Sequence, residues 1–209
     1  MLRSVGTCMV RQLDALMRSV SGIDEYSTDP DCLLRFRVTT SNDRVDFADG
    51  GTVHRGESIG ELHLWSERVP IMLAEGPDIR WAVTMRRRFE YSLRLLAQHV
   101  DQEPHLRSII WFRGRGALSA PTGQPSPFRV LERLGFRLLE PAQDRAFRSE
   151  FVRFWKNLHN WWLVWTFNPS SLTDKHFDQL ERIEFWMSRE ELMARYGTKA
   201  ASRVRQSQR

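Results

Sequence analysis

The chain has 209 residues, 41% of them hydrophobic, which is enough to bury a core and fits one domain most simply. Its two cysteines, Cys8 and Cys32, exclude a disulfide framework and lack a metal-binding spacing; we interpret them as buried thiols in a reducing compartment. The net charge of +5 comes from five basic residues after residue 194, where no acidic residue occurs. The rest of the chain carries no formal net charge, which argues against a nucleic-acid-binding face.

The N-terminal segment predicts an amphipathic helix over residues 1–22, ended by Ser21-Gly22. This helix either packs on the body of the protein or lies on a membrane surface. No apolar run approaches the ~18 residues that span a bilayer, and the start lacks a signal-peptide pattern. We therefore expect a cytoplasmic protein, with peripheral contact at the inner membrane through Met1–Val20 or the basic tail as the alternative.

A β-rich region follows. Strands are predicted at "CLLRFRVTT" (Cys32–Thr40) and "RVDFA" (Arg44–Ala48), with a turn at Asp49–Gly51. Two further segments, "TVHRGES" and "IGELHLW", bring the chain to Trp65. Consecutive short strands joined by turns predict an antiparallel meander.

The pattern then changes to a helical one. Residues 80–100 carry an apolar stripe at helical spacing, surrounded by arginines. "LRSIIWF" (Leu106–Phe112) predicts a strand that is central in the sheet, ending at "RGRG" (Arg113–Gly116) and a loop rich in Pro, Gly and Ser. Ser126-Pro127 begins a short helix that Gly135 ends, and "FRLLEP" predicts a further strand.

The C-terminal part is rich in aromatic residues. Residues 146–167 predict a helix whose phenylalanines and tryptophans recur every three or four positions, which is typical of a core face, with a sugar-stacking surface as the alternative. "ERIEFWM" (Glu181–Met187) predicts a strand. Ser188 followed by Glu191 forms a capping box for a last helix that ends near Gly197.

These elements predict an α+β fold, a mostly antiparallel sheet with an N-terminal meander packed against several helices, with a GNAT-like arrangement as a variant. The domain prediction is an N-terminal helix over 1–22, a single α+β domain over 23–197 and a basic disordered tail over 198–209.

The segment most suggestive of chemistry is "ELHLW", because Glu61, His63 and Trp65 alternate along a predicted strand and share one face. Side chains two positions apart are about 6.5–7 Å apart, too far for a direct Glu–His hydrogen bond in a flat strand. They are close enough to line one pocket, where a histidine beside a carboxylate can act as a general base. The alternative is a purely structural strand histidine. No metal site is predicted.

The second candidate is "RGRGALS", with Arg113, Gly114, Arg115 and Gly116 directly after a predicted strand. Guanidinium groups next to glycines favour anion binding, since glycine lets a phosphate approach the backbone. The segment partly resembles the acyl-CoA pyrophosphate loop of GNAT acetyltransferases, Q/R-x-x-G-x-G/A. Gly116 fits that pattern, but Leu118 stands where glycine or alanine is needed. An exposed turn is the alternative.

Taken with "ESIGELHLW" and "LERLGF", the closing "FWMSREELMARYG" makes the chain resemble the YkoP-like domain family over about Cys32 to Gly197. Its most specific pieces are Glu61-Leu62-His63 and the stretch Ser188–Leu192 with Tyr196 and Gly197. The chain departs from the family pattern at Trp65-Ser66-Glu67, where an acidic residue and an asparagine are expected. The resemblance implies a bacterial setting near polysaccharide-deacetylase-like proteins and envelope glycan genes, without a defined activity. The metal motif of the deacetylase fold is missing.

The leading hypothesis is a protein of envelope polysaccharide or glycolipid metabolism that binds an anionic, sugar-containing ligand or a partner enzyme. The site hypothesis places Glu61, His63, Arg113 and Arg115 at one pocket, with Trp65 as a stacking wall and no cofactor. The main alternative is a GNAT-like N-acyltransferase that uses acyl-CoA, in which His63 or Glu61 deprotonates an amine and the 113–116 backbone holds the pyrophosphate. A structural or interaction domain is the third.

Overall fold

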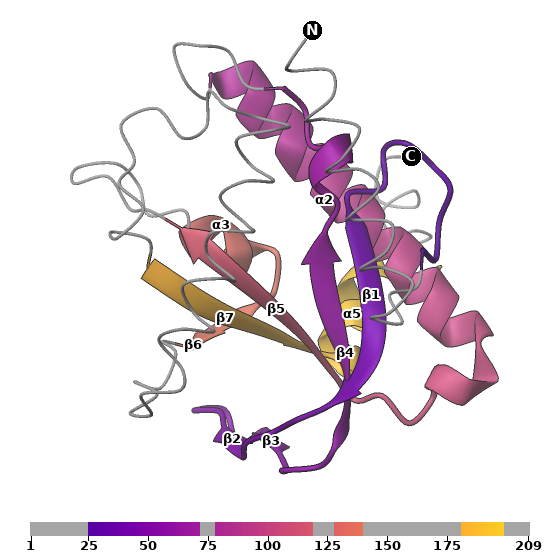
Figure 1. Ribbon diagram of the computed structural model, residues 1–209, viewed down its shortest axis with the longest axis vertical. Coiled ribbons are helices and arrows are strands. Elements are labelled where there is room, and N and C mark those ends of the chain that lie inside the picture. The colour runs from indigo at the N-terminus through magenta and orange to yellow at the C-terminus, as the bar shows by residue number, and fades with distance from the viewer. Residues whose placement is uncertain (1–24, 72–77, 119–127, 140–180, 199–209) are drawn as a thin grey trace, which may run out of the picture.

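A five-stranded mixed sheet forms the centre of the molecule in the computed structural model, which describes residues 25–71, 78–118, 128–139 and 181–198. The strand order is β1-β4-β5-β7-β6, and all neighbours are antiparallel except β4 and β5, which are parallel. The fold is therefore α+β, as predicted, and β5 is the central strand (Figure 1). The strands are β1 (Leu34–Thr40), β4 (Ser58–Leu64), β5 (Trp111–Leu118), β6 (Arg137–Leu139) and β7 (Glu181–Ser188).

The predicted N-terminal meander is wrong in its connectivity. β1 pairs directly with β4, while β2 (Val45–Asp46) and β3 (Thr52–Val53) form a separate two-stranded hairpin. The hairpin turn contains Gly50 at φ +88°, a backbone conformation that glycine adopts without strain. The hairpin leaves the sheet because its apolar side chains pack on Trp111 and Trp186 instead of continuing the strand order.

Helices cover one face of the sheet. They are α2 (Ile79–Gln102), α3 (Phe128–Arg133) and α5 (Arg189–Tyr196), with short 3-10 turns η1 (Ser66–Arg68) and η2 (Pro104–Leu106). Asp78 caps α2 by accepting a hydrogen bond from the Trp81 amide at 2.7 Å. Ser188 caps α5 by accepting from the Glu191 amide at 3.1 Å, which confirms the predicted N-terminal cap.

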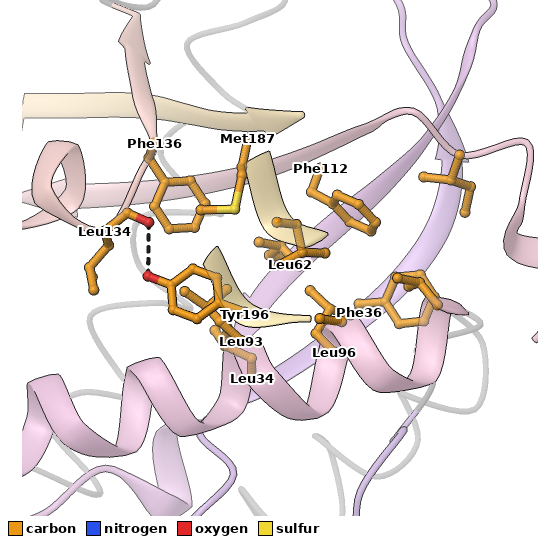
Figure 2. Close-up of a cluster of buried hydrophobic side chains, with 14 of the residues drawn as sticks. Leu34, Phe36, Leu62, Leu93, Leu96, Phe112, Leu134, Phe136, Met187 and Tyr196 are labelled. Atoms are coloured by element: carbon orange, nitrogen blue, oxygen red, sulfur yellow. Dashed lines mark hydrogen bonds between the residues drawn. The ribbon is translucent and has the colours of Figure 1, made fainter. Parts of the chain in front are cut away.

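The main hydrophobic core lies between this face and the helices α2 and α5 (Figure 2). It contains side chains from β1, β4, β5, β7 and both helices, including Phe36, Leu62, Leu93, Phe112 and Met187. At its edge the Tyr196 hydroxyl donates to the Leu134 carbonyl oxygen at 2.9 Å. The alternation of apolar and polar residues in β1 and β4 thus has a physical cause, since Leu34, Phe36 and Leu62 point into this core and the residues between them face the other way.

The "RGRG" segment is strand, not the turn that was predicted. Residues 104–106 form η2, the strand begins at Trp111, and it continues through Arg113–Gly116 to Leu118. These residues pair with β7, from Trp111↔Ser188 to Leu118↔Glu181. Gly114 is required by packing, because a Cβ built there would lie 1.9 Å from Cε2 of Phe185.

The other predicted elements divide into two groups. The helix over 80–100, the short helix after Pro127, the strand after Gly135 and the strand over 181–187 are confirmed as α2, α3, β6 and β7. The helices predicted over 1–22 and 146–167, the loop over 119–127 and most of the C-terminal tail lie outside the described residues. Among the described residues, no helix is long and apolar enough to cross a membrane.

Candidate functional site

The face of the sheet opposite the main core is lined with charged side chains, and we call it the polar face. Cross-strand register places its residues in two rows. The first row runs from β1 to β6 and consists of Arg37, Glu61, Arg113, Trp186 and Arg137. In the second row, Arg35 lies opposite His63 and Arg115 lies opposite Glu184. These rows contain five arginines and two glutamates, and Asp49 and Glu67 pair with Arg137 and Arg35 from outside the rows. Five guanidinium groups thus face four carboxylates, which leaves a small excess of positive charge on the polar face.

Glu61 is the hub of this face, and only 4% of its side chain is exposed. Its Oε2 accepts from Arg37 Nε at 2.9 Å, and its Oε1 accepts from Arg113 Nη2 at 3.1 Å. Arg115 Nη1 lies 3.5 Å from the same Oε1. We call Arg37, Glu61, His63, Arg113 and Arg115 the Glu61 cluster.

Charge around Glu61 fixes its protonation state. Burial alone would raise the pKa of this carboxyl, but the neighbouring His63, Arg37 and Arg113 outweigh burial and hold its pKa far below the usual value of 4.5. Glu61 is therefore a carboxylate at neutral pH and a weak proton acceptor. This environment does not support the hypothesis that Glu61 acts as a general base.

His63 is one of the three partly exposed members of the cluster, with Arg37 and Arg115. Its Nε2 lies 3.6 Å from Glu61 Oε2, an ion-pair distance slightly longer than a hydrogen bond, and 33% of its side chain is exposed. Within the described part of the chain this Nε2 has no hydrogen-bond partner. His63 therefore does not have both ring nitrogens bonded to the backbone, an arrangement that would have given it a purely structural role.

Arg113 and Arg115 lie on the same face as Glu61 and His63, two positions apart on β5. Arg113 is buried, with 6% of its side chain exposed, whereas Arg115 is 48% exposed and donates to Glu184 Oε1 at 2.7 Å. Burial and the charge of Arg115 lower the pKa of Arg113, although Glu61 opposes them. The sequence hypothesis that Glu61, His63, Arg113 and Arg115 lie together agrees with these distances.

Gly114 and Gly116 contribute differently from the prediction. Both are in the extended backbone of β5 and pair with Phe185 and Ile183 of β7. They do not form a turn over a phosphate. Pairing between β4 and β5 covers only Gly60↔Phe112, Glu61↔Arg113 and Leu62↔Gly114, so the two strands separate beyond Leu62 (Figure 1).

Trp65 lies just beyond the end of β4 and is 7% exposed. The Cζ atom of Arg68 lies 3.2 Å from the centroid of its ring, and that of Arg35 lies 4.9 Å away. Arg68 also donates to the backbone carbonyl of Cys32 at 3.3 Å. The predicted stacking role for Trp65 would require these guanidinium groups to move.

Sequence reasoning missed Arg37 and Glu184 as partners of the cluster. Arg37 alternates with apolar residues in "LRFRV", and Glu184 alternates in "ERIEFW", so both strands show that a charged residue faces away from the core. That signal identifies the face, but not the strands that lie beside each other. The described residues contain no group of three or more potential metal ligands.

A surface cavity of about 240 Å³ lies away from the Glu61 cluster. It is lined by Asp29, Asp31, Arg87, Arg88 and Tyr91. Its two carboxylates are already paired, since Arg88 Nη2 lies 2.8 Å from Asp31 Oδ1 and the Tyr91 hydroxyl donates to Asp29 Oδ2 at 2.7 Å. We regard this cavity as a surface feature, and these two contacts hold α2 to the segment before β1.

Comparison with known proteins identifies the family. A family model described as YkoP domain matches residues 4–196, which is most of the chain. No curated protein and no solved structure matches the chain. The match includes the strand that carries Glu61 and His63, the paired strand β5 and the capped helix α5. The chain belongs to the YkoP domain family.

Proposed function

We propose that this YkoP domain binds an anionic, sugar-containing ligand at the Glu61 cluster. The observation that supports this most strongly is the charge balance around Glu61. Arg37 and Arg113 donate to this single buried carboxylate, and Arg115 and His63 lie within 3.6 Å of it. Because more cationic groups surround Glu61 than one carboxylate can neutralise, the remaining positive charge favours binding of a second anion.

The exposure of the cluster fits a binding site with a rigid base and an accessible rim. Glu61 and Arg113 are buried and hold each other, while Arg37, His63 and Arg115 have a third to a half of their side chains exposed. Arginine presents a planar fork that binds a phosphate or carboxylate through two parallel hydrogen bonds. Because Glu61 already fixes these groups, little ordering is required when the ligand binds.

The sugar portion of the ligand rests on the family setting. YkoP-like domains are associated with envelope glycan genes, so we propose a role in polysaccharide or glycolipid metabolism, with a partner enzyme as a further ligand class. The separation of β4 from β5 beyond Leu62 lies next to His63 and Arg115, which makes this the position where a ligand would reach the cluster.

A thermal-shift screen tests this proposal. Nucleotide sugars, glycolipid head groups and acyl-CoAs are added to the wild type, to His63→Ala and to Arg115→Ala. We expect an anionic sugar ligand to raise the Tm of the wild type and to raise it less in both variants, because each variant removes one polar side chain of the rim. Arg94→Ala, an exposed arginine on α2, is the matched control. A ligand that stabilises all four proteins equally would place its site elsewhere.

A GNAT-like acyltransferase is the second candidate, and the strand topology favours it. β4 and β5 are parallel, joined through α2, and separate after three residue pairs, and β7 lies between β5 and β6. This resembles the arrangement of GNAT acetyltransferases. In such a reaction the amine would attack the thioester carbon, His63 would accept its proton, and the thiol of coenzyme A would leave.

Two measurements separate this candidate from simple binding. An acyltransferase releases free coenzyme A when acyl-CoA and an amine acceptor are added, and His63→Ala should lower that rate by roughly 10²–10⁴-fold. A binding protein gives a thermal shift without thiol release. Because residues 113–116 are strand, the pyrophosphate would have to bind outside that segment.

A further inference from the structure

The polar face contains hydrogen-bond donors that the Glu61 cluster does not use. Within the described part of the chain, Arg113 Nε, Trp186 Nε1 and Arg137 Nη1 are buried atoms without a hydrogen-bond partner. They come from three adjacent strands of one row, because Trp186 pairs with Arg113 on one side and with Arg137 on the other. The Cζ atom of Arg113 lies 5.4 Å from the centroid of the Trp186 ring.

Unpaired buried donors cost free energy unless something accepts from them. Arg113 is 5% exposed and Trp186 is fully buried, so bulk water does not satisfy them. An indole N–H and a guanidinium N–H only donate, and neither can accept a hydrogen bond. An acceptor with several lone pairs satisfies both donors, and the positive charge of Arg113 favours one that is negatively charged, such as a phosphate or a carboxylate oxygen.

We propose that Arg113 and Trp186 form a buried oxyanion subsite for the acidic group of the ligand, with Arg137 on its far side. This inference rests on the proposed function and names the part of the ligand that enters deepest. The ligand's hydroxyl-bearing portion remains at the rim, and its phosphate or carboxylate accepts from Arg113 Nε and Trp186 Nε1.

The route to this subsite passes Arg115. Its side chain is about half exposed and lies between Glu61 Oε1, at 3.5 Å, and Glu184 Oε1, at 2.7 Å. Arg115 and Glu184 occupy the positions next to Arg113 and Trp186 on β5 and β7. Movement of this exposed ion pair uncovers the Arg113–Trp186 pair without disturbing the main core, and the released Arg115 fork is then available to the entering anion.

The chain offers a matched pair of tryptophans for the test. Trp111 and Trp186 belong to the same small hydrophobic cluster, and both contact Phe47. Of these two indole nitrogens, only Nε1 of Trp186 is a buried donor without a hydrogen-bond partner among the described residues. Trp186→Phe removes this N–H and keeps an aromatic ring, and Trp111→Phe makes the same change beside it.

The experiment follows the indole N–H signals of the ¹⁵N-labelled full chain by NMR while inorganic phosphate or acetate is added. The Trp186 signal, identified by its loss in Trp186→Phe, should shift and saturate. Phosphate affinity should fall roughly tenfold in Trp186→Phe, the loss expected for one hydrogen bond to a charged group, and less than about twofold in Trp111→Phe. If Trp186→Phe fails to fold, the Trp186 indole signal is assigned in the wild type by sequential backbone assignment, since Trp111 also contacts Phe47, and its response alone decides.

A Trp186 signal that stays in place through the phosphate and acetate titrations overturns the subsite, as does equal weakening by both substitutions. This outcome is distinct from failure of the proposed function. A sugar ligand whose thermal shift depends on Arg115, combined with an unresponsive Trp186, removes the subsite and keeps the rim. If the Trp186 signal responds but no sugar ligand stabilises the protein, the subsite is kept and the proposed sugar-binding function is rejected.

Discussion

Glu61 shows at the scale of one residue how a buried charge is kept in a folded protein. Removing a carboxylate from water is costly, and the cost is offset only when hydrogen bonds and opposite charges replace the lost hydration. Arg37 and Arg113 supply those hydrogen bonds from the strands on either side. Removing Glu61 would therefore leave Arg113 buried without its acceptor.

The first prediction concerns Glu61→Gln. At neutral pH we expect the free energy of unfolding to fall by about 3 kcal/mol, because a buried charge loses its counter-ion. Chemical denaturation measures this loss. Glu184→Gln is the control, since Glu184 pairs with the exposed side of Arg115 and should cost about 1 kcal/mol or less. Equal losses in the two variants would contradict the role of Glu61 as the hub.

The same pair of proteins gives a pH prediction with a definite sign. The folded-state pKa of Glu61 is depressed, so its contribution to stability is present above the usual value of 4.5 and is lost as the pH falls below it. The stability difference between the wild type and Glu61→Gln should therefore shrink between pH 7 and pH 3. A difference that stays constant over this range would mean that the pKa of Glu61 is not depressed.

At the scale of elements, packing between strands decides which small residues are required. Gly114 lies opposite Phe185, whose ring occupies the space that any side chain at 114 would need. Gly60 has a similar relation to the ring of Phe112. These two glycines let aromatic rings lie flat on the central strands, which closes the core under α2 and α5.

Gly114→Ala should lower the free energy of unfolding by about 1–3 kcal/mol, because the added Cβ overlaps a ring in a packed core. Thermal or chemical denaturation measures the change. Combining it with Phe185→Leu, which frees part of that space, should restore some of the loss relative to Phe185→Leu alone. If the two substitutions are simply additive, the ring of Phe185 is not what excludes a side chain at 114.

Arg189 ties α5 to the end of α2. Its guanidinium donates to the carbonyl oxygens of Val100 and Leu106, the latter at 2.8 Å. Arg189→Met keeps the aliphatic stem and leaves these carbonyls without that donor, so we expect a loss of about 2 kcal/mol. Arg94→Met, in an exposed ion pair, should cost less than about 0.5 kcal/mol. Indistinguishable Tm values for the two variants would contradict this clamp.

Elements of this fold differ in how far the sequence predicts them. A long periodic segment such as α2 is predictable, because burial imposes a repeat that the residues must follow, and the short helix α5 is predictable from its cap at Ser188. The two-residue strands of the hairpin leave no such repeat. The "RGRG" stretch resembles a turn by composition, and only its pairing with β7 explains its glycines.

The sequence predicts several residues of the candidate site, but it does not predict how they are arranged in space. Glu61 and His63 are neighbours in the sequence, but Arg113 is 52 positions away from Glu61. Their contact depends on β4 lying beside β5, a long-range pairing that no local pattern specifies. Arg37 and Trp186 likewise lie at the site only because of the pairing register of their strands, which no local pattern specifies.

At the scale of the whole molecule, the sheet separates two different environments. One face closes the main hydrophobic core with α2 and α5. The other face carries a smaller apolar cluster under the β2–β3 hairpin, arginines around Glu61, and buried donors at Arg113 and Trp186. A fold stabilised by these two apolar clusters can carry an excess of positive charge around Glu61, and that excess is the basis of the proposed function.

The most direct test of this account is a calorimetric titration with the anionic sugar ligand that gives the largest thermal shift. The wild type, Arg115→Ala and Arg94→Ala are compared at two salt concentrations. We expect Arg115→Ala to weaken binding at least tenfold and to reduce its salt dependence, with Arg94→Ala close to the wild type. Binding that is unchanged in Arg115→Ala would contradict the claim that the charged face of the sheet holds the ligand.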